Sequence, residues 1–351
     1  MSNDNDNKRP IAHILGDGCL GRADDDTALT LDGYSTYTVW DLLHAPKPRV
    51  KWFWGDGITG VLPADSLAAV AGYTSEGKTT LAFHLAAAAV EGRYFLGHAV
   101  SQIDRALLVT ETDEVQAREL FEAANLTGRG QGAITVCPSQ PTASELQALV
   151  DELRPELLVL DSLTSIAPGL GIHGGGTFDW NAPAHVTAVV LWLRWLRKQY
   201  RISLVMPLVH SVKPPRDKEG NRLRPTPTAA DVRGSGAVLE QMDTSFVIVP
   251  TSGEVCGYLA RVKRRRAGTV ERVEFKYDPD RGVFLPTALT DDAVIEAVRA
   301  GHTSREAVAR YLHFRRDDVS QTINRLVGEG RLSEPANGKL TISLDIVCRE
   351  A

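Results

Sequence analysis

The feature that most restricts the fold of this chain is the stretch Val70–Thr80, VAGYTSEGKTT. It follows a short apolar run, Leu67–Ala71, and precedes an alanine-rich segment with a helical pattern, residues 79–91. Gly72 and Gly77 enclose four residues and are followed by lysine and threonine, which is the pattern of a phosphate-binding loop. Together with its strand-then-helix context, the pattern predicts a nucleoside triphosphate pocket. The alternative is a chance match in a turn.

The residue types in this loop suit a triphosphate. The glycines let backbone N–H groups surround the phosphates, and the helix N-terminus adds positive potential. Lys78 is expected to reach the β- and γ-phosphates, and Thr79 to bind Mg²⁺. We therefore predict ATP and Mg²⁺ as cofactors. The predicted nucleotide-binding residues are Gly72, Tyr73, Thr74, Ser75, Glu76, Gly77, Lys78, Thr79 and Thr80.

Apolar runs and helical patterns alternate along most of the chain, which predicts an α/β fold with a mainly parallel sheet covered on both faces. Ligands of such sheets bind at the carboxyl ends of the strands. The runs are Leu67–Ala71, Ala106–Val109, Ala133–Val136, Leu157–Leu160, Ser203–Val209 and Phe246–Val249, and the helical patterns cover residues 79–91, 113–124, 143–153 and 184–200. After Pro286 the pattern changes to short helices, so a chain of 351 residues is expected to form a second, smaller domain.

Composition adds several expectations. The chain contains no apolar run long enough for a membrane span and no apolar segment at its start, so we expect a cytoplasmic protein without a membrane partner. Its four cysteines are widely separated, which does not suggest a disulfide framework or a zinc site. The net charge is −5, yet five of the six residues 261–266 are basic. Any site for a polyanion should therefore be local.

Two acidic residues at strand ends are candidates for the hydrolysis machinery. Asp161 ends the buried-strand run ELLVLD, the form of a Walker B strand, and would bind Mg²⁺ together with Thr79. A solvated aspartate at a strand end is the alternative. Ser162 follows, so the group that activates water must come from elsewhere. Glu111 ends the run RALLVTE and is the candidate, although this segment also fits the start of a helix.

Taken together, these residues resemble the RecA-like ATPases of the plasmid RepA-type replicative helicase family, over residues 40–285. The stretch WGDGITGVLPADSLAAVAGYTSEGKTTLAFHLA is similar to the family's approach to its phosphate loop, and LLVTET is similar to its glutamate strand. VMPLVHSVK resembles the strand that ends in a histidine pair, with Val209 in place of the first histidine. The resemblance implies that His210 senses the γ-phosphate.

The resemblance also implies an arginine finger donated to a neighbouring subunit. RGSGAVLEQMDTSFVIV and RVKRRRAG are similar to the family's final motor elements, and we favour Arg266 as the finger within the possible register of residues 263–266. A finger acting in trans implies a homo-oligomeric ring, here a hexamer. A solvated or DNA-facing strand end is the alternative interpretation of this basic run.

The segment between residues 213 and 233 carries six basic and three acidic residues and four prolines. The resemblance implies a channel loop that follows a single DNA strand by charge. A disordered surface loop is the alternative. The DNA-binding candidates here are Lys213, Arg216, Lys218, Arg222, Arg224 and Arg233.

The C-terminal part, residues 290–347, reads as three helices and a hairpin around an Asn-Gly turn, which resembles a winged helix domain. Such a domain could bind duplex DNA through its third helix or dock a protein. The candidates on that helix are Arg315, Arg316, Gln321, Asn324 and Arg325. The expected domains are thus a flexible arm at residues 1–38, a RecA-like core at 39–286 and a winged helix at 290–347.

The sequence therefore predicts a ring-forming, ATP-hydrolysing DNA motor, with a RepA-type replicative helicase on single-stranded DNA as the leading hypothesis. Two alternatives use the same core. One is a recombinase or replication initiator that hydrolyses ATP on DNA without unwinding it. The other is a DNA-binding regulator whose winged helix is switched by ATP.

Overall fold

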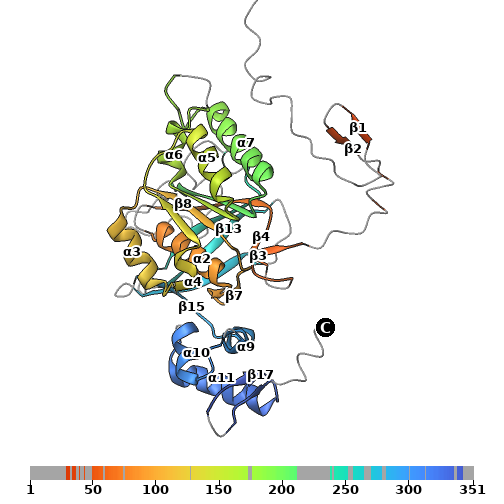
Figure 1. Cartoon of the computed structure of the whole chain (residues 1–351), viewed down its shortest axis with the longest axis vertical. Coiled ribbons are helices and arrows are strands. Elements are labelled where there is room, and N and C mark those ends of the chain that lie inside the picture. Colours follow the sequence, from red (N-terminus) through yellow and green to blue (C-terminus); the bar gives the residue numbers. More distant parts are fainter. Residues whose placement is uncertain are drawn as a thin grey trace, which may run out of the picture. The chain divides into compact units, whose positions relative to one another are not determined.

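The computed structural model describes most of the chain (Figure 1). The described residues are 29–31, 34–36, 39, 43, 50–57, 60–73, 76–126, 128–172, 176–211, 238, 241–251, 256–264, 270–278, 282–299, 301–312, 314–335 and 338–342. The chain divides into two compact units, Met1–Arg49 and Val50–Ala351. In the first unit, β1 (Leu29–Leu31) and β2 (Tyr34–Thr36) form a small antiparallel pair.

A nine-stranded sheet forms the centre of the second unit, in the order β15-β14-β13-β12-β5-β11-β10-β8-β9. The six strands from β12 to β9 run parallel, whereas β13, β14 and β15 continue the sheet in antiparallel fashion. The prediction of an α/β fold with a mainly parallel sheet is confirmed. The strands are β5 (Ser66–Gly72), β8 (Ala106–Thr110), β9 (Ile134–Cys137), β10 (Leu157–Asp161), β11 (Leu204–His210), β12 (Thr244–Pro250), β13 (Cys256–Arg264), β14 (Arg272–Asp278) and β15 (Val283–Pro286).

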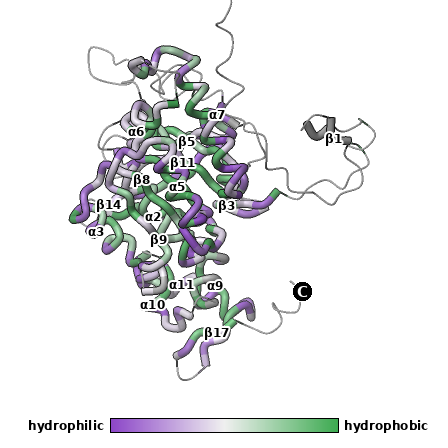
Figure 2. The backbone as a smooth tube through the Cα atoms, turned by 45° about the horizontal axis from the view of Figure 1, so that its top comes forward, coloured by the Kyte–Doolittle hydropathy of each residue, from purple (hydrophilic) through white to green (hydrophobic). Residues whose placement is uncertain are grey.

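Alternating side chains of the parallel strands enter two separate cores. On one face, Ala68 and Val70 of β5 join α2 (Lys78–Glu91) and α3 (Glu114–Ala123). On the other, Leu67, Ala69 and Ala71 join α5 (Ala143–Leu153), α6 (Leu163–Gly169) and α7 (Pro183–Tyr200). Both faces of the sheet are therefore buried, as continuous apolar strands require. Apolar colour accordingly gathers along β5 and β11 in Figure 2.

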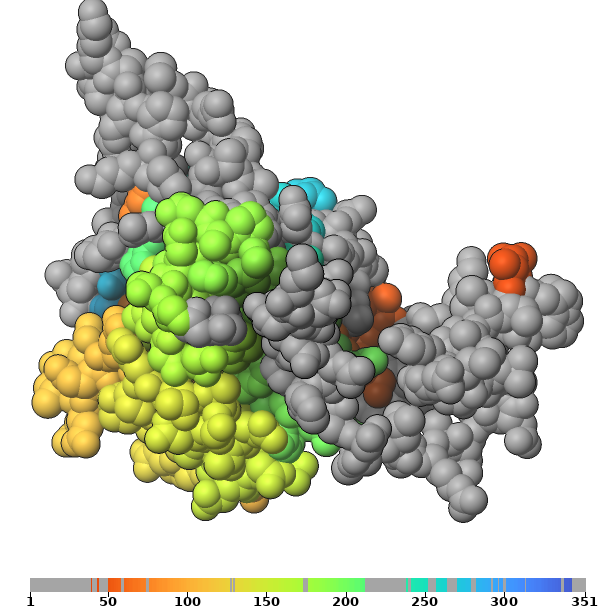
Figure 3. All heavy atoms as spheres, turned by 90° about the horizontal axis from the view of Figure 1, so that it is seen from above, coloured from red at the N-terminus to blue at the C-terminus, as the bar shows by residue number. Residues whose placement is uncertain are grey.

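Short elements complete the core. β3 (Trp52–Trp54) pairs with β4 (Leu62–Pro63), and β6 (Tyr94–Phe95) with β7 (His98–Ala99). Phe53 and Trp54 are buried, as expected for packing residues rather than a stacking surface. α4 (Gly128–Gln131) precedes β9. In the space-filling view, residues of α5, α6 and α7, coloured yellow to green, lie together on the face of this unit that is turned toward the viewer (Figure 3).

The C-terminal part has its own apolar cluster. It consists of α9 (Asp291–Arg299), α10 (Arg305–Leu312) and α11 (Arg316–Gly328), followed by the antiparallel pair β16 (Leu332–Ser333) and β17 (Thr341–Ile342). In α11, Val319, Ile323 and Leu326 follow helical spacing and are buried, so one face of the helix packs inward.

Within the described residues, no helix is both long enough and apolar enough to span a membrane.

Candidate functional site

The predicted phosphate loop lies between the end of β5 and the start of α2, at the carboxyl edge of the sheet. Gly77 has a φ of 80°, a backbone conformation that favours glycine. A Cβ atom added there would lie 2.8 Å from the ring of Phe284 in β15. Glycine is thus required at position 77 both for its backbone angle and for space. Thr74 and Ser75 of the predicted set lie outside the described residues.

Lys78 is buried and turns back toward the loop. Its ammonium group donates hydrogen bonds to the carbonyl oxygens of Gly72, at 3.0 Å, and Tyr73, at 2.7 Å. Burial lowers the pKa of Lys78, while the nearby charges of Asp161 and Glu76 raise it. The ammonium group is therefore held beside the backbone that is predicted to surround the phosphates.

Glu76 makes a contact that the sequence pattern does not predict. One oxygen of its carboxylate accepts a hydrogen bond from the backbone N–H of Tyr73 at 2.6 Å. Backbone N–H groups of such loops are the donors that bind phosphate oxygens. A carboxylate of the protein itself therefore accepts from one amide of the predicted phosphate cradle.

Asp161, at the end of β10, is brought to the loop by the neighbouring strands. Its Oδ2 accepts a hydrogen bond from the Thr79 hydroxyl at 2.7 Å and lies 3.1 Å from the Thr110 hydroxyl. Burial raises the pKa of Asp161, and the hydrogen bonds from Thr79 and Thr110 oppose this shift. The structure thus brings together Thr79 and Asp161, the two residues predicted to bind the metal.

These oxygens suit Mg²⁺. A magnesium ion is typically bound by one or two carboxylates, with waters and substrate phosphates completing its shell. Within the described part of the chain, no cluster of three or more His, Cys, Asp or Glu side chains could hold a metal alone. One carboxylate and one hydroxyl beside a phosphate loop therefore fit a metal that arrives with a nucleotide.

Glu111 directly follows β8, whose last residue, Thr110, is paired with Asp161 of β10. Its backbone N–H donates to the carbonyl oxygen of Asp161 at 3.2 Å, and its side chain is exposed. Its carboxylate Oε1 accepts a hydrogen bond from Gln140 Nε2 at 2.9 Å. Sequence reasoning missed Gln140, which follows β9. In the sequence, the only indication of Gln140 was that it follows another apolar run, which becomes β9 and ends at the same edge of the sheet as β8.

His210 ends β11 and is paired in register with Gly72, the first glycine of the loop. The backbone N–H of the next residue, Ser211, donates to the Gly72 carbonyl oxygen at 3.0 Å. The end of β11 is therefore hydrogen-bonded to the first glycine of the loop. The sensor role of His210 itself stays a prediction.

The predicted arginine finger and channel loop cannot be placed. Lys263 and Arg264 lie in β13, next to β12. Arg266, Lys213, Arg216, Lys218, Arg222, Arg224 and Arg233 lie outside the described residues.

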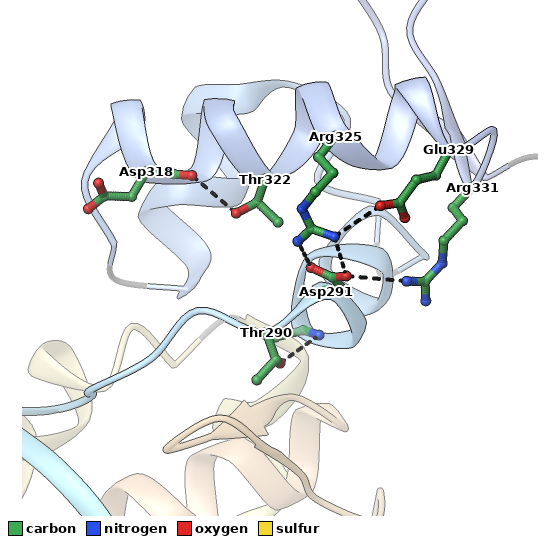
Figure 4. Close-up of polar contacts among 8 residues, drawn as sticks. Thr290, Asp291, Asp318, Thr322, Arg325, Glu329 and Arg331 are labelled. Atoms are coloured by element: carbon green, nitrogen blue, oxygen red, sulfur yellow. Dashed lines mark hydrogen bonds and ion pairs between the residues drawn. The ribbon is translucent and has the colours of Figure 1, made fainter.

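The predicted DNA-binding residues of α11 are exposed, but one of them, Arg325, forms ion pairs with other residues of the protein (Figure 4). Arg325 donates to both carboxylate oxygens of Asp291, with Nη1 at 2.8 Å from Oδ2, and forms an ion pair with Glu329 at 3.2 Å. Arg331 also approaches Asp291, at 3.4 Å. Arg325 thus links α11 to α9. The other candidates, Arg315, Arg316, Gln321 and Asn324, lie at the start of α11 or along it.

A comparison with protein families supports the nucleotide-site interpretation. No curated protein matches the sequence. A family model described as "AAA domain" matches residues 29–216, which is more than half of the 351-residue chain and includes the phosphate loop, Glu111 and Asp161. The chain therefore belongs to this AAA domain family of P-loop proteins.

Proposed function

We propose that this protein is an ATP-dependent DNA motor, and specifically a ring-forming helicase of the RepA type that hydrolyses ATP on single-stranded DNA. The observation that carries the ATPase part is the convergence of Thr79, Asp161 and Glu111 beside the phosphate loop. The three side chains come from α2 and from the ends of neighbouring strands. In this proposal they supply the metal-binding groups and the group that activates water, which a phosphate loop alone lacks.

In the proposed hydrolysis, a water oxygen forms a bond to the γ-phosphorus as the bond from that phosphorus to the β,γ-bridging oxygen breaks. Glu111 accepts the proton of the water. Lys78 stabilises charge on the β- and γ-phosphates, and Thr79 and Asp161 hold the metal-binding side. Bound Mg²⁺ would neutralise charge on the phosphate oxygens. ADP and inorganic phosphate are the products.

The DNA part rests on the sequence resemblance and on charge. Lys213, Arg216, Lys218, Arg222, Arg224 and Arg233 form the proposed single-strand loop. Arg266 is proposed to act in the pocket of the neighbouring subunit of a hexamer, where it would stabilise the transition state. The three helices and hairpin at residues 290–342 are proposed to be a winged helix that meets duplex DNA through exposed residues such as Arg316 and Gln321.

The first experiment measures ATP hydrolysis with and without single-stranded DNA, with assembly state recorded in the same samples. We expect single-stranded DNA to stimulate hydrolysis, and we expect the active protein to be assembled as a ring. Glu111→Gln should lower kcat by about 100-fold to 10,000-fold while nucleotide binding is retained, and Lys78→Ala should weaken binding and hydrolysis together. Glu119→Gln, which changes another exposed glutamate of the neighbouring α3, is the matched control and should retain activity.

The outcomes separate the candidate functions. Stimulation by DNA without strand separation would favour a recombinase or initiator. DNA-independent hydrolysis by a monomer would refute the motor and favour a regulator switched by ATP. If Glu111→Gln retained full activity, Glu111 would not be the base.

A further inference from the structure

Two parallel neighbouring strands bring Glu111 and Gln140 together at the edge of the sheet. β8 and β9 are in register, with Val109 beside Cys137, and each is followed by one of the two residues. Gln140 Nε2 then donates to Glu111 Oε1 at 2.9 Å. The amide of one loop therefore contacts the carboxylate that is proposed to activate water.

The backbone that follows Gln140 is held in place by several contacts. Pro141, which follows, is buried and has a restricted φ. Thr142 caps α5, and its capping box with Glu145 fixes the start of that helix. Ala143 N–H also donates to the Leu170 carbonyl oxygen, just after α6, at 3.2 Å. The Gln140 side chain therefore extends from a segment that is anchored at the start of α5.

An amide suits the task of orienting a carboxylate base. An exposed glutamate samples several rotamers, and restricting them costs side-chain entropy of about 1–2 kcal/mol. A neutral donor that binds one oxygen restricts the carboxylate without cancelling its charge, and it leaves the other oxygen to accept a hydrogen bond from water. A lysine or arginine at the same place would add a full opposing charge.

We propose that Gln140 is a positioning residue for ATP hydrolysis and orients Glu111 toward the attacking water. This inference rests on the proposed function, in which Glu111 is the base. It concerns the rate of the chemical step and not nucleotide affinity, because the contact of Gln140 is with Glu111 rather than with the phosphate loop.

The test compares kcat and nucleotide Kd in Gln140→Ala and Gln140→Glu, using ATP for kcat and ADP for Kd. Gln140→Ala should lower kcat by about tenfold to 100-fold, because a displaced catalytic group loses its alignment, while Kd stays within about twofold. Gln140→Glu keeps the size of the side chain but loses the amide donor and adds a like charge, so kcat should fall at least as far.

Gln147→Ala is the matched control. The amide of Gln147 donates to the Tyr200 hydroxyl at 3.2 Å and not to Glu111, so kcat of this variant should stay at the wild-type value.

Three results would overturn this inference without affecting the proposed function. Wild-type kcat in Gln140→Ala would exclude a role, and wild-type kcat in Gln140→Glu would show that only the volume of the side chain matters. A change confined to Kd would equally contradict positioning. By contrast, a wild-type protein that does not hydrolyse ATP, or a fully active Glu111→Gln variant, would refute the proposed function, and the inference would fall with it.

Discussion

Glu76 and Lys78 place opposite charges in the loop that is proposed to receive a triphosphate. Lys78 bonds to two carbonyl oxygens, and Glu76 accepts from the Tyr73 N–H group. A phosphate that binds this amide must displace the carboxylate and would be repelled by it. Glu76 is therefore expected to lower the affinity of the empty loop for nucleotide.

Glu76→Gln should bind ATP about tenfold more tightly, because a hydrogen bond to a charged group contributes about 1.5 kcal/mol and a tenfold change in Kd corresponds to about 1.4 kcal/mol. Titration calorimetry with ATP in the Glu111→Gln background, where hydrolysis is slow, measures the change. Glu119→Gln in that background is the control. Weaker binding would instead mean that Glu76 holds the loop in its binding shape.

At the scale of elements, Asp291 joins three parts of the C-terminal region. It lies at the start of α9 and accepts from Arg325 of α11 and from Arg331, which precedes β16 (Figure 4). The hydrogen bond from Arg325 lowers the pKa of Asp291. The folded state therefore favours the ionised carboxylate, and this stability is present above the ordinary aspartate pKa and lost as pH falls through the lowered value.

Asp291→Asn should lower the free energy of unfolding at neutral pH by about 0.5–1 kcal/mol, the size expected for a partly exposed ion-pair group. The difference from wild type should shrink as the pH falls from about 4 toward the lowered pKa of Asp291, because the unfolded wild-type chain gains the aspartate proton first. Urea unfolding at several pH values measures it. Asp317→Asn, at an exposed position of α11, is the control, and an effect of equal size there would contradict the assignment.

The elements also differ in how well the sequence predicts them. The parallel strands lie within two residues of the predicted apolar runs, because strands buried on both faces leave continuous apolar sequence. β14 was missed because only alternate residues, such as Val273 and Phe275, are buried. α6, which contains Pro168, was missed as well. The contact of Gln140 with Glu111 could not be predicted, since it depends on the register of β8 and β9.

At the scale of the whole molecule, the sequence predicts the proposed nucleotide site more directly than the proposed DNA-binding surfaces. The loop motif and the acids Asp161 and Glu111 were sufficient to predict a nucleotide site, and folding brings them together. The DNA-binding proposal instead depends on a family resemblance and on basic residues of which several, such as Arg222, lie outside the described part. Local patterns encode the pocket, whereas partners depend on a surface assembled from distant segments.

Stability of the second unit should fall in alkaline solution. Burial raises the pKa of Tyr311 to about 12, with Arg93 lowering it and Glu91 raising it to smaller extents. As pH rises above about 10, the unfolded chain loses the tyrosine proton first, so stability is lost between about pH 10 and the raised value. Tyr311→Phe should lose less stability than wild type over this range in thermal unfolding followed by circular dichroism. A parallel decline in Tyr311→Phe would contradict this assignment, and Tyr258→Phe is the control.

The aromatic residues that follow β10 and α6 have an optical consequence. Trp180 is partly buried, its ring lies 5.0 Å from that of Phe178, and its indole N–H donates to the Thr164 carbonyl oxygen at 3.2 Å. Thr164 belongs to α6, which begins two residues after Asp161. A rearrangement at the end of β10 that moved α6 would therefore change the hydrogen bond or the exposure of this indole, on which its emission depends. The protein contains a tryptophan hydrogen-bonded to the helix that follows β10, so the proposed binding of a nucleotide is expected to change its fluorescence without an attached dye.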